Sequence, residues 1–135
     1  MIHAFRLTRG QDLRKEIERY CEDHKIEAAV VLSSVGCLSR LKVRLAGGTE
    51  YKEYEQDFEI ISVNGTLSKD GPHLHISVSG LKDDKGNELV IGGHLSEGCI
   101  VNTTAEIVLM ELEDYSFSRE YDKATGYKEL VIKRK

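Results

Sequence analysis

The stretch His73-Leu74-His75-Ile76-Ser77-Val78-Ser79 decides the fold of this chain, because polar and apolar residues alternate along it without a break. Such alternation is typical of a β-strand, in which successive side chains point to opposite faces. We therefore expect the three apolar side chains to face a core, with His73 and His75 together on the opposite face. Two imidazoles on one face of one strand can reach a single ion.

A second segment follows after a short loop, Asp83-Asp84-Lys85-Gly86-Asn87, that is typical of a β-hairpin. It runs through a short strand, residues 89–91, into Gly92-Gly93-His94, where the glycine pair allows close backbone approach. Neutral imidazole is a common metal ligand, and three histidines with one open position match a catalytic zinc site. We predict that His73, His75 and His94 bind zinc or another divalent transition metal such as nickel, copper or iron.

Two alternatives to a metal site stay open. Histidines on a strand also serve as half-exposed hydrogen-bonding residues without any ion. The Gly92-Gly93 pair also occurs where a strand carries a bulge or crosses close to another strand. A bulge is compatible with a metal site, because it re-aims a side chain.

The rest of the chain predicts one helix and about eight short strands. Apolar residues at Leu13, Ile17, Tyr20 and Cys21 indicate an amphipathic helix over residues 11–24. Residues 28–32 read as a strand buried on both faces that ends in a turn at Ser33-Ser34-Val35-Gly36, and Asn64-Gly65 ends or bends another strand. The other predicted strands cover residues 2–7, 41–45, 58–63, 100–110, 115–121 and 127–132, with an edge strand or loop around Tyr51 and Tyr54.

Most links between these segments are too short for a parallel crossover, so the pairing must be mainly antiparallel. The fold class predicted is α+β, with a largely antiparallel or mixed sheet and one main N-terminal helix. We expect residues 1–135 to form a single domain, because neither a linker nor a repeat interrupts them.

Composition limits the classes of function. The chain is 40% hydrophobic and 31% charged, as in soluble globular proteins, and has neither a signal-peptide pattern nor an 18-residue apolar run. We therefore expect a cytoplasmic protein without a membrane partner. Cys21, Cys37 and Cys99 are widely spaced, which argues against a disulfide framework and against a thiolate zinc site. The net charge of −4 argues against a nucleic-acid partner.

Several segments come in the order and spacing of one known family. They are Gly10-Gln11-Asp12-Leu13, Ser34-Val35-Gly36, Phe58-Glu59-Ile60-Ile61-Ser62, Gly65-Thr66-Leu67, His73-Leu74-His75-Ile76-Ser77, Ile91-Gly92-Gly93-His94-Leu95 and Thr104-Ala105-Glu106. Over nearly its whole length the chain resembles the plant and prokaryote conserved (PPC or PCC) domain. The resemblance implies a largely antiparallel sheet, a homotrimer, and a metal at the histidine cluster.

Plant members of this family carry the domain behind an AT-hook, a short Arg-Gly-Arg-Pro segment that enters the DNA minor groove. Here Gln11 follows Arg9-Gly10, and the only proline is Pro72, so the chain looks like the stand-alone prokaryotic type. The family's DNA-binding label therefore depends on a segment that this sequence lacks.

Other polar residues carry weaker predictions. Glu106 is a candidate partner for a ligating histidine or a general base, with a strand carboxylate paired to an arginine as the alternative. Arg6, Arg40 and Arg44 are candidates for an anionic pocket, with solvated strand faces as the alternative. Ser33 belongs to a predicted strand-end turn, since the chain has no G-x-S-x-G motif.

Three functions remain. The first is a metal-binding homotrimeric module with a regulatory or interaction role and an unidentified small-molecule or protein partner. The second is a small zinc-dependent metalloenzyme, and the third is a DNA-associated protein. Assembly has a physical reason as well, because residues 28–32 and 107–110 are apolar on both faces and one helix covers only one face of a sheet.

Overall fold

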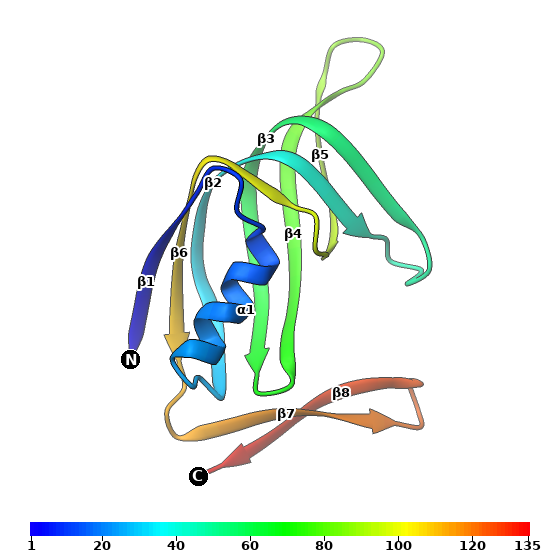
Figure 1. Cartoon of the computed structure of the whole chain (residues 1–135). Coiled ribbons are helices and arrows are strands. Elements are labelled where there is room, and N and C mark those ends of the chain that lie inside the picture. Colours follow the sequence, from blue (N-terminus) through cyan, green and yellow to red (C-terminus); the bar gives the residue numbers. More distant parts are fainter.

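Six of the eight strands form one antiparallel sheet in the computed structural model, which describes all 135 residues (Figure 1). The strand order is β1-β6-β2-β3-β4-β5, and β7 and β8 pair separately as a hairpin. The strands are β1 (Ile2–Thr8), β2 (Ala28–Arg44), β3 (Tyr51–Ser68), β4 (Gly71–Lys82), β5 (Glu88–Leu95), β6 (Ile100–Glu111), β7 (Tyr115–Asp122) and β8 (Tyr127–Arg134). The predicted antiparallel sheet with one helix is confirmed.

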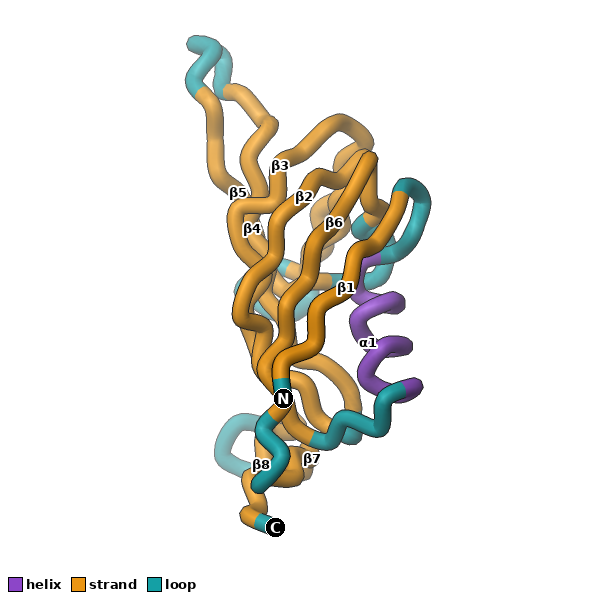
Figure 2. Tube along the Cα trace, turned by 90° about the vertical axis from the view of Figure 1, so that its left-hand side faces the viewer, coloured by secondary structure: helices purple, strands orange, loops and turns teal.

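The helix α1 (Leu13–Asp23) confirms the predicted helix, with each end within two residues of the expected one. Asp12 caps it: one carboxylate oxygen accepts from the Lys15 peptide N–H at 3.1 Å, and the other accepts from the Gly98 N–H at 2.7 Å. Leu13 and Ile17 are fully buried and belong to the main core cluster. Figure 2 shows that α1 covers only one face of the sheet.

One predicted break is wrong, and at a second position, Asn64-Gly65, the strand does not end. β2 runs through the expected turn at residues 33–36, because bulges against β6 at Val31/Ser33 and Gly36/Cys37 absorb the irregular pattern. One consequence is that Leu32 is 49% exposed, so residues 28–32 are not buried on both faces. β3 likewise continues through Gly65, where an added Cβ would lie 2.0 Å from the His73 carbonyl oxygen. That glycine serves a close strand approach rather than a turn.

The sheet bends back on itself at one end. The last residues of β2 pair with β5 in addition to β3, in the register Val43↔Leu95 and Arg44↔His94. Strands β2, β3, β4 and β5 thus form a closed ring of pairings at this end. The closure brings the end of β2 beside the end of β5, and it positions the candidate site.

The β7–β8 hairpin crosses the lower end of the sheet in Figure 1, near both chain termini. Phe117, 6% exposed, anchors it: its peptide N–H donates to the Glu27 carbonyl, and its carbonyl accepts from the Lys69 N–H, both at 3.1 Å. The predicted turn after Asp122 is confirmed. None of the structure's helices has the length and apolar character needed to cross a bilayer.

Candidate metal centre

The structure brings the three predicted histidines together. His75 on β4 lies directly opposite His94 on β5, and His73 is two residues before His75 on the same face of β4. The ring centroids of His75 and His94 are 4.6 Å apart, and those of His73 and His75 are 5.3 Å apart. One ligand atom from each ring lies within 4.8 Å of the other two. This is the arrangement that a single ion requires.

Strand alternation explains which side the histidines occupy. Leu74 and Ile76 are 4% and 3% exposed and belong to the core cluster that also includes Ile17 of α1. The imidazoles of His73 and His75 therefore lie on the opposite face, where both residues are exposed. The prediction that the apolar side chains of this strand face the core and the histidines face away from it is confirmed.

The glycine pair is required by close backbone approach, as predicted. A Cβ at Gly92 would lie 2.1 Å from the Ile76 carbonyl oxygen, and one at Gly93 would lie 2.6 Å from the Arg44 carbonyl oxygen. Side chains at these positions would push β5 away from β4 on one side and from β2 on the other. His94 would then leave its place beside His75.

The three imidazoles have no protein partners that would compete with an ion. None of them hydrogen-bonds to another protein group, and His94 Nδ1 is a buried nitrogen without any partner. Loss of solvation lowers the pKa of His94, and the charges of Arg44 and His75 lower it further. The pKa of His73 is lowered by partial desolvation first and then by Arg119. Unpartnered imidazoles suit a divalent cation, and the lowered pKa values of His73 and His94 favour the neutral form that binds metal, so these residues fit a bound metal.

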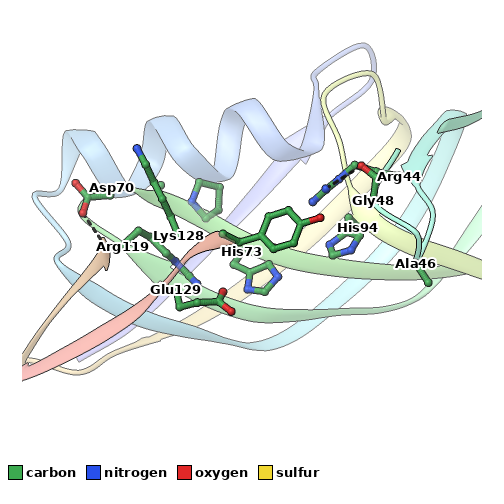
Figure 3. A pocket seen from close by; sticks show the side chains of 12 residues that line it. Arg44, Ala46, Gly48, Asp70, His73, His94, Arg119, Lys128 and Glu129 are labelled. Carbon is green, nitrogen blue, oxygen red and sulfur yellow. Dashed lines mark hydrogen bonds between the residues drawn. The ribbon is translucent and has the colours of Figure 1, made fainter. Parts of the chain in front are cut away.

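A cavity of about 700 Å³ opens beside His73 and His94 (Figure 3). Arg44 is the cross-strand partner of His94 and lines the cavity, as one of the predictions proposed. Arg119 of β7 also lines it, and its Nη2 donates to Thr66 Oγ1 at 2.9 Å. Sequence reasoning missed Arg119, because no local pattern reveals onto which end of the sheet the hairpin docks.

The other candidates lie elsewhere. Glu106 is exposed on β6 opposite Arg6 of β1, and strands β2 and β3 separate β6 from β4, so the fold does not bring it to the histidines. Arg40 pairs with Glu53 at 2.9 Å, away from the cavity. Ser34 is a buried strand residue whose hydroxyl accepts from the Val63 N–H. All three cysteines are free.

Known proteins share this architecture. The chain is 44% identical over 133 residues to the bifunctional protein GlmU of Synechococcus sp. (strain JA-3-3Ab), an alignment that covers 98% of the chain and 21% of that relative. The chain therefore spans about a fifth of the length of the curated relatives that it matches.

Three solved structures have the same fold. A protein from Salmonella enterica matches with a TM-score of 0.90 and 35% identity, over 100% of this chain and 94% of that one. A metal-containing protein from Archaeoglobus fulgidus matches with a TM-score of 0.73 and 27% identity, over 97% and 93%. A protein from Bacteroides thetaiotaomicron, named as a candidate DNA-binding protein, has a TM-score of 0.79 over 96% and 91%, but at 21% identity it shows the fold alone.

The predicted resemblance is confirmed by the family model as well. The model described as the Plants and Prokaryotes Conserved (PCC) domain matches residues 1–113, which include β1 to β6, the helix and all three clustered histidines. The β7–β8 hairpin lies beyond the matched region. On this match, which covers most of the chain, the protein belongs to the Plants and Prokaryotes Conserved domain family.

Proposed function

We propose that residues 1–135 act as one domain that binds a divalent transition metal, with zinc as the first choice, through His73, His75 and His94. One observation carries the proposal: three imidazoles without protein hydrogen bonds converge so that their ligand atoms lie within 4.8 Å of one another. The metal-containing relative from Archaeoglobus fulgidus, with the same fold, supports it. Zinc accepts three imidazoles and keeps a fourth position open.

Metal content tests this proposal directly. The wild type, purified without added metal, should contain about one ion per chain by elemental analysis. His75→Ala should lose most of this metal, because the two remaining histidines bind an ion far more weakly than three do. The protein should still fold, since His75 is exposed. His24→Ala, at the exposed end of α1, is the matched control and should keep the metal. Equal metal in all three proteins would overturn the proposal.

The role proposed for the domain is that of a regulatory or interaction module in a homotrimer. A similar region forms about a fifth of the bifunctional relative from Synechococcus, which supports the role of a module. Figure 2 shows that the sheet face opposite α1 has no helix over it. By strand register and burial, that face exposes apolar side chains, among them Ile2, Val35, Val90 and Met110, which supports assembly. An apolar face without cover is buried by association, and closed symmetry stops growth at a defined number of subunits.

Light scattering tests the assembly. A homotrimer has three times the 15.2 kDa mass of the chain. A monomer that persists at high protein concentration would overturn this part of the proposal. Because His75 lies on the same sheet face, removal of the metal with a chelator should weaken the trimer if the ion sits at the subunit boundary. If chelation leaves the trimer unchanged, the ion does not lie at the subunit boundary, and the proposed trimer itself still stands.

A second function, a small zinc-dependent enzyme, has one observation in its favour. The cavity beside the histidines is also lined by the carboxylate of Glu129, which lies close enough to His73 to oppose the fall in its pKa. A zinc ion bound there would supply Lewis-acid chemistry, and Glu129 would hold or accept a proton. Glu129→Gln should then abolish any hydrolytic turnover without loss of zinc.

A further inference from the structure

We propose that the cavity beside the histidine cluster binds a small hydrophilic molecule by its carboxylate or phosphate group, held between Arg44 and Arg119. This inference rests on the proposed metal site and names the class of ligand that would share it. The experiment below separates the failure of one proposal from the failure of the other.

The backbone register brings both arginines to the histidines. Arg44 lies directly opposite His94, and residues opposite each other on antiparallel strands share a face. Thr66 lies directly opposite His73, and its hydroxyl accepts a hydrogen bond from Arg119 Nη2 at 2.9 Å. The ring centroids of His73 and His94 are 6.0 Å apart. Figure 3 accordingly shows His73 and His94 between Arg119 and Arg44.

Each guanidinium is oriented but keeps free donors. Arg44 Nη1 donates to the Gly48 carbonyl at 3.3 Å, and Arg119 uses one nitrogen for Thr66. Neither guanidinium forms an ion pair with a carboxylate, whereas those of Arg40 and Arg19 elsewhere each form one. A guanidinium has five N–H donors in a planar fork that matches a carboxylate or phosphate. Two such forks facing one cavity therefore fit an oxyanion.

The charge of the lining favours an anion as well. Arg44, Arg119 and Lys128 contribute three positive charges, and Asp70 and Glu129 contribute two negative ones. Asp70 is already engaged, since it accepts the Arg119 peptide N–H at 2.8 Å. A divalent ion on the histidines would add two positive charges within the same cavity. An incoming anionic group would balance this excess.

The rest of the lining selects a hydrophilic ligand. Only two of the twelve lining residues are hydrophobic, and the volume of about 700 Å³ lies in the range of small-molecule sites. The Tyr127 hydroxyl reaches this cavity beside Gly48, where an added Cβ would lie 3.4 Å from Tyr127 Oη and 3.5 Å from Arg44 Nη1. A lipid or a flat aromatic molecule would find little apolar surface here.

The two halves of this cavity come from different parts of the chain. The histidines and Arg44 lie within the region that the family model matches, but Arg119, Tyr127 and Lys128 belong to the β7–β8 hairpin beyond it. The hairpin thus supplies cations to a site whose metal ligands are set by the sheet. The proposed anion site therefore depends on the hairpin as well as on the sheet.

Calorimetric titration of the zinc-loaded protein tests the proposal, with inorganic phosphate and succinate as probes and glycerol as a neutral control. The zinc content of each sample is measured first. Phosphate or succinate should bind the wild type, and Arg44→Gln and Arg119→Gln should each weaken that binding about tenfold, as expected for the loss of a charged hydrogen bond. The stronger of the two probes identifies the anionic group.

Arg40→Gln is the matched control, because it removes the same charge from β2 away from the cavity. It should leave binding unchanged, and an equal loss in Arg40→Gln would overturn the proposal by showing a general charge effect. Full zinc content with no binding of either anion at millimolar concentration would also overturn it. If the wild type holds no zinc but still binds an anion through Arg44 and Arg119, the anion site stands and the metal site fails.

Discussion

The β4–β5 strand pair and the β7–β8 hairpin contribute to the same cavity in different ways. The strand pair lies inside the sheet, and its histidines are placed by strand alternation and by glycines that permit close approach. The hairpin lies outside the matched family region and is attached through a few contacts around Phe117. The metal ligands thus depend on the sheet itself, whereas the cations beside them depend on how a peripheral hairpin packs against it.

Damage to the strand pair should have the largest effect. In Gly92→Ala the new Cβ would meet the Ile76 carbonyl oxygen at 2.1 Å, so β5 must move away from β4. We expect a loss of about 4 kcal/mol of unfolding free energy, at the upper end for single substitutions, together with loss of metal binding. Urea denaturation and zinc titration measure both effects.

Gly47→Ala is the control for this prediction, because Gly47 has open space around it and lies in an exposed loop. Its free energy of unfolding should stay within about 0.5 kcal/mol of the wild type. Unchanged stability and zinc affinity in Gly92→Ala would show that the approach of β5 to β4 is not what positions His94.

Damage to the hairpin should separate the two functions of the cavity. Phe117→Ala removes a buried ring and should cost about 3 kcal/mol, chiefly by loosening the hairpin. Zinc binding should persist, while phosphate or succinate binding should fall, because Arg119 loses its support. Tyr121→Ala on the same strand is the control, since Tyr121 is 66% exposed. If Phe117→Ala lost zinc and anion together, the two regions would not be separable.

The same contrast explains how much the sequence could predict. The alternation around His73 and His75 predicted the strand and its buried face, since these depend on local periodicity. The grouping with His94 came instead from the glycine pair before it and from the family resemblance. The spacing of Leu13 and Ile17 predicted the helix for the same reason.

Non-local features could not be predicted in this way. The bulges that carry β2 through residues 33–36 depend on its pairing with β6, which no local pattern shows. Arg119 is brought to the cavity by the docking of the hairpin, and the pairing of β2 with β5 selects Arg44 from the three arginines that the sequence offered. Glu106 was grouped with the histidines on its type alone, but the strand order places it near the other edge of the sheet.

A smaller effect concerns pH and the metal-free protein. Burial and neighbouring charges lower the folded-state pKa values of His73 and His94, while an unfolded imidazole titrates at about 6.5. Between those values the unfolded chain binds more protons, so the free energy of unfolding should fall as the pH drops below about 6.5. Urea denaturation of metal-free protein from pH 8 to pH 5 measures this. The variant with His73→Gln and His94→Gln should show a shallower fall, and an equal fall in both proteins would contradict the prediction.

The smallest effect that we expect is the binding of duplex DNA by this chain. The hairpin and the terminal residues carry several cations, including Lys123, Lys128 and Lys133, but the whole chain has a net charge of −4, so the remainder is more acidic still. A protein that binds duplex DNA without sequence readout does so by neutralising phosphates, and its affinity falls steeply with salt. At about 150 mM salt such binding has dissociation constants of roughly 10⁻⁴ to 10⁻⁶ M, and we expect this chain to bind no more tightly.

A gel-shift titration measures this affinity. Sub-micromolar binding would contradict the proposal that the hairpin cations bind a small anion. Loss of that binding in Lys128→Gln would then show that the hairpin itself is the DNA contact.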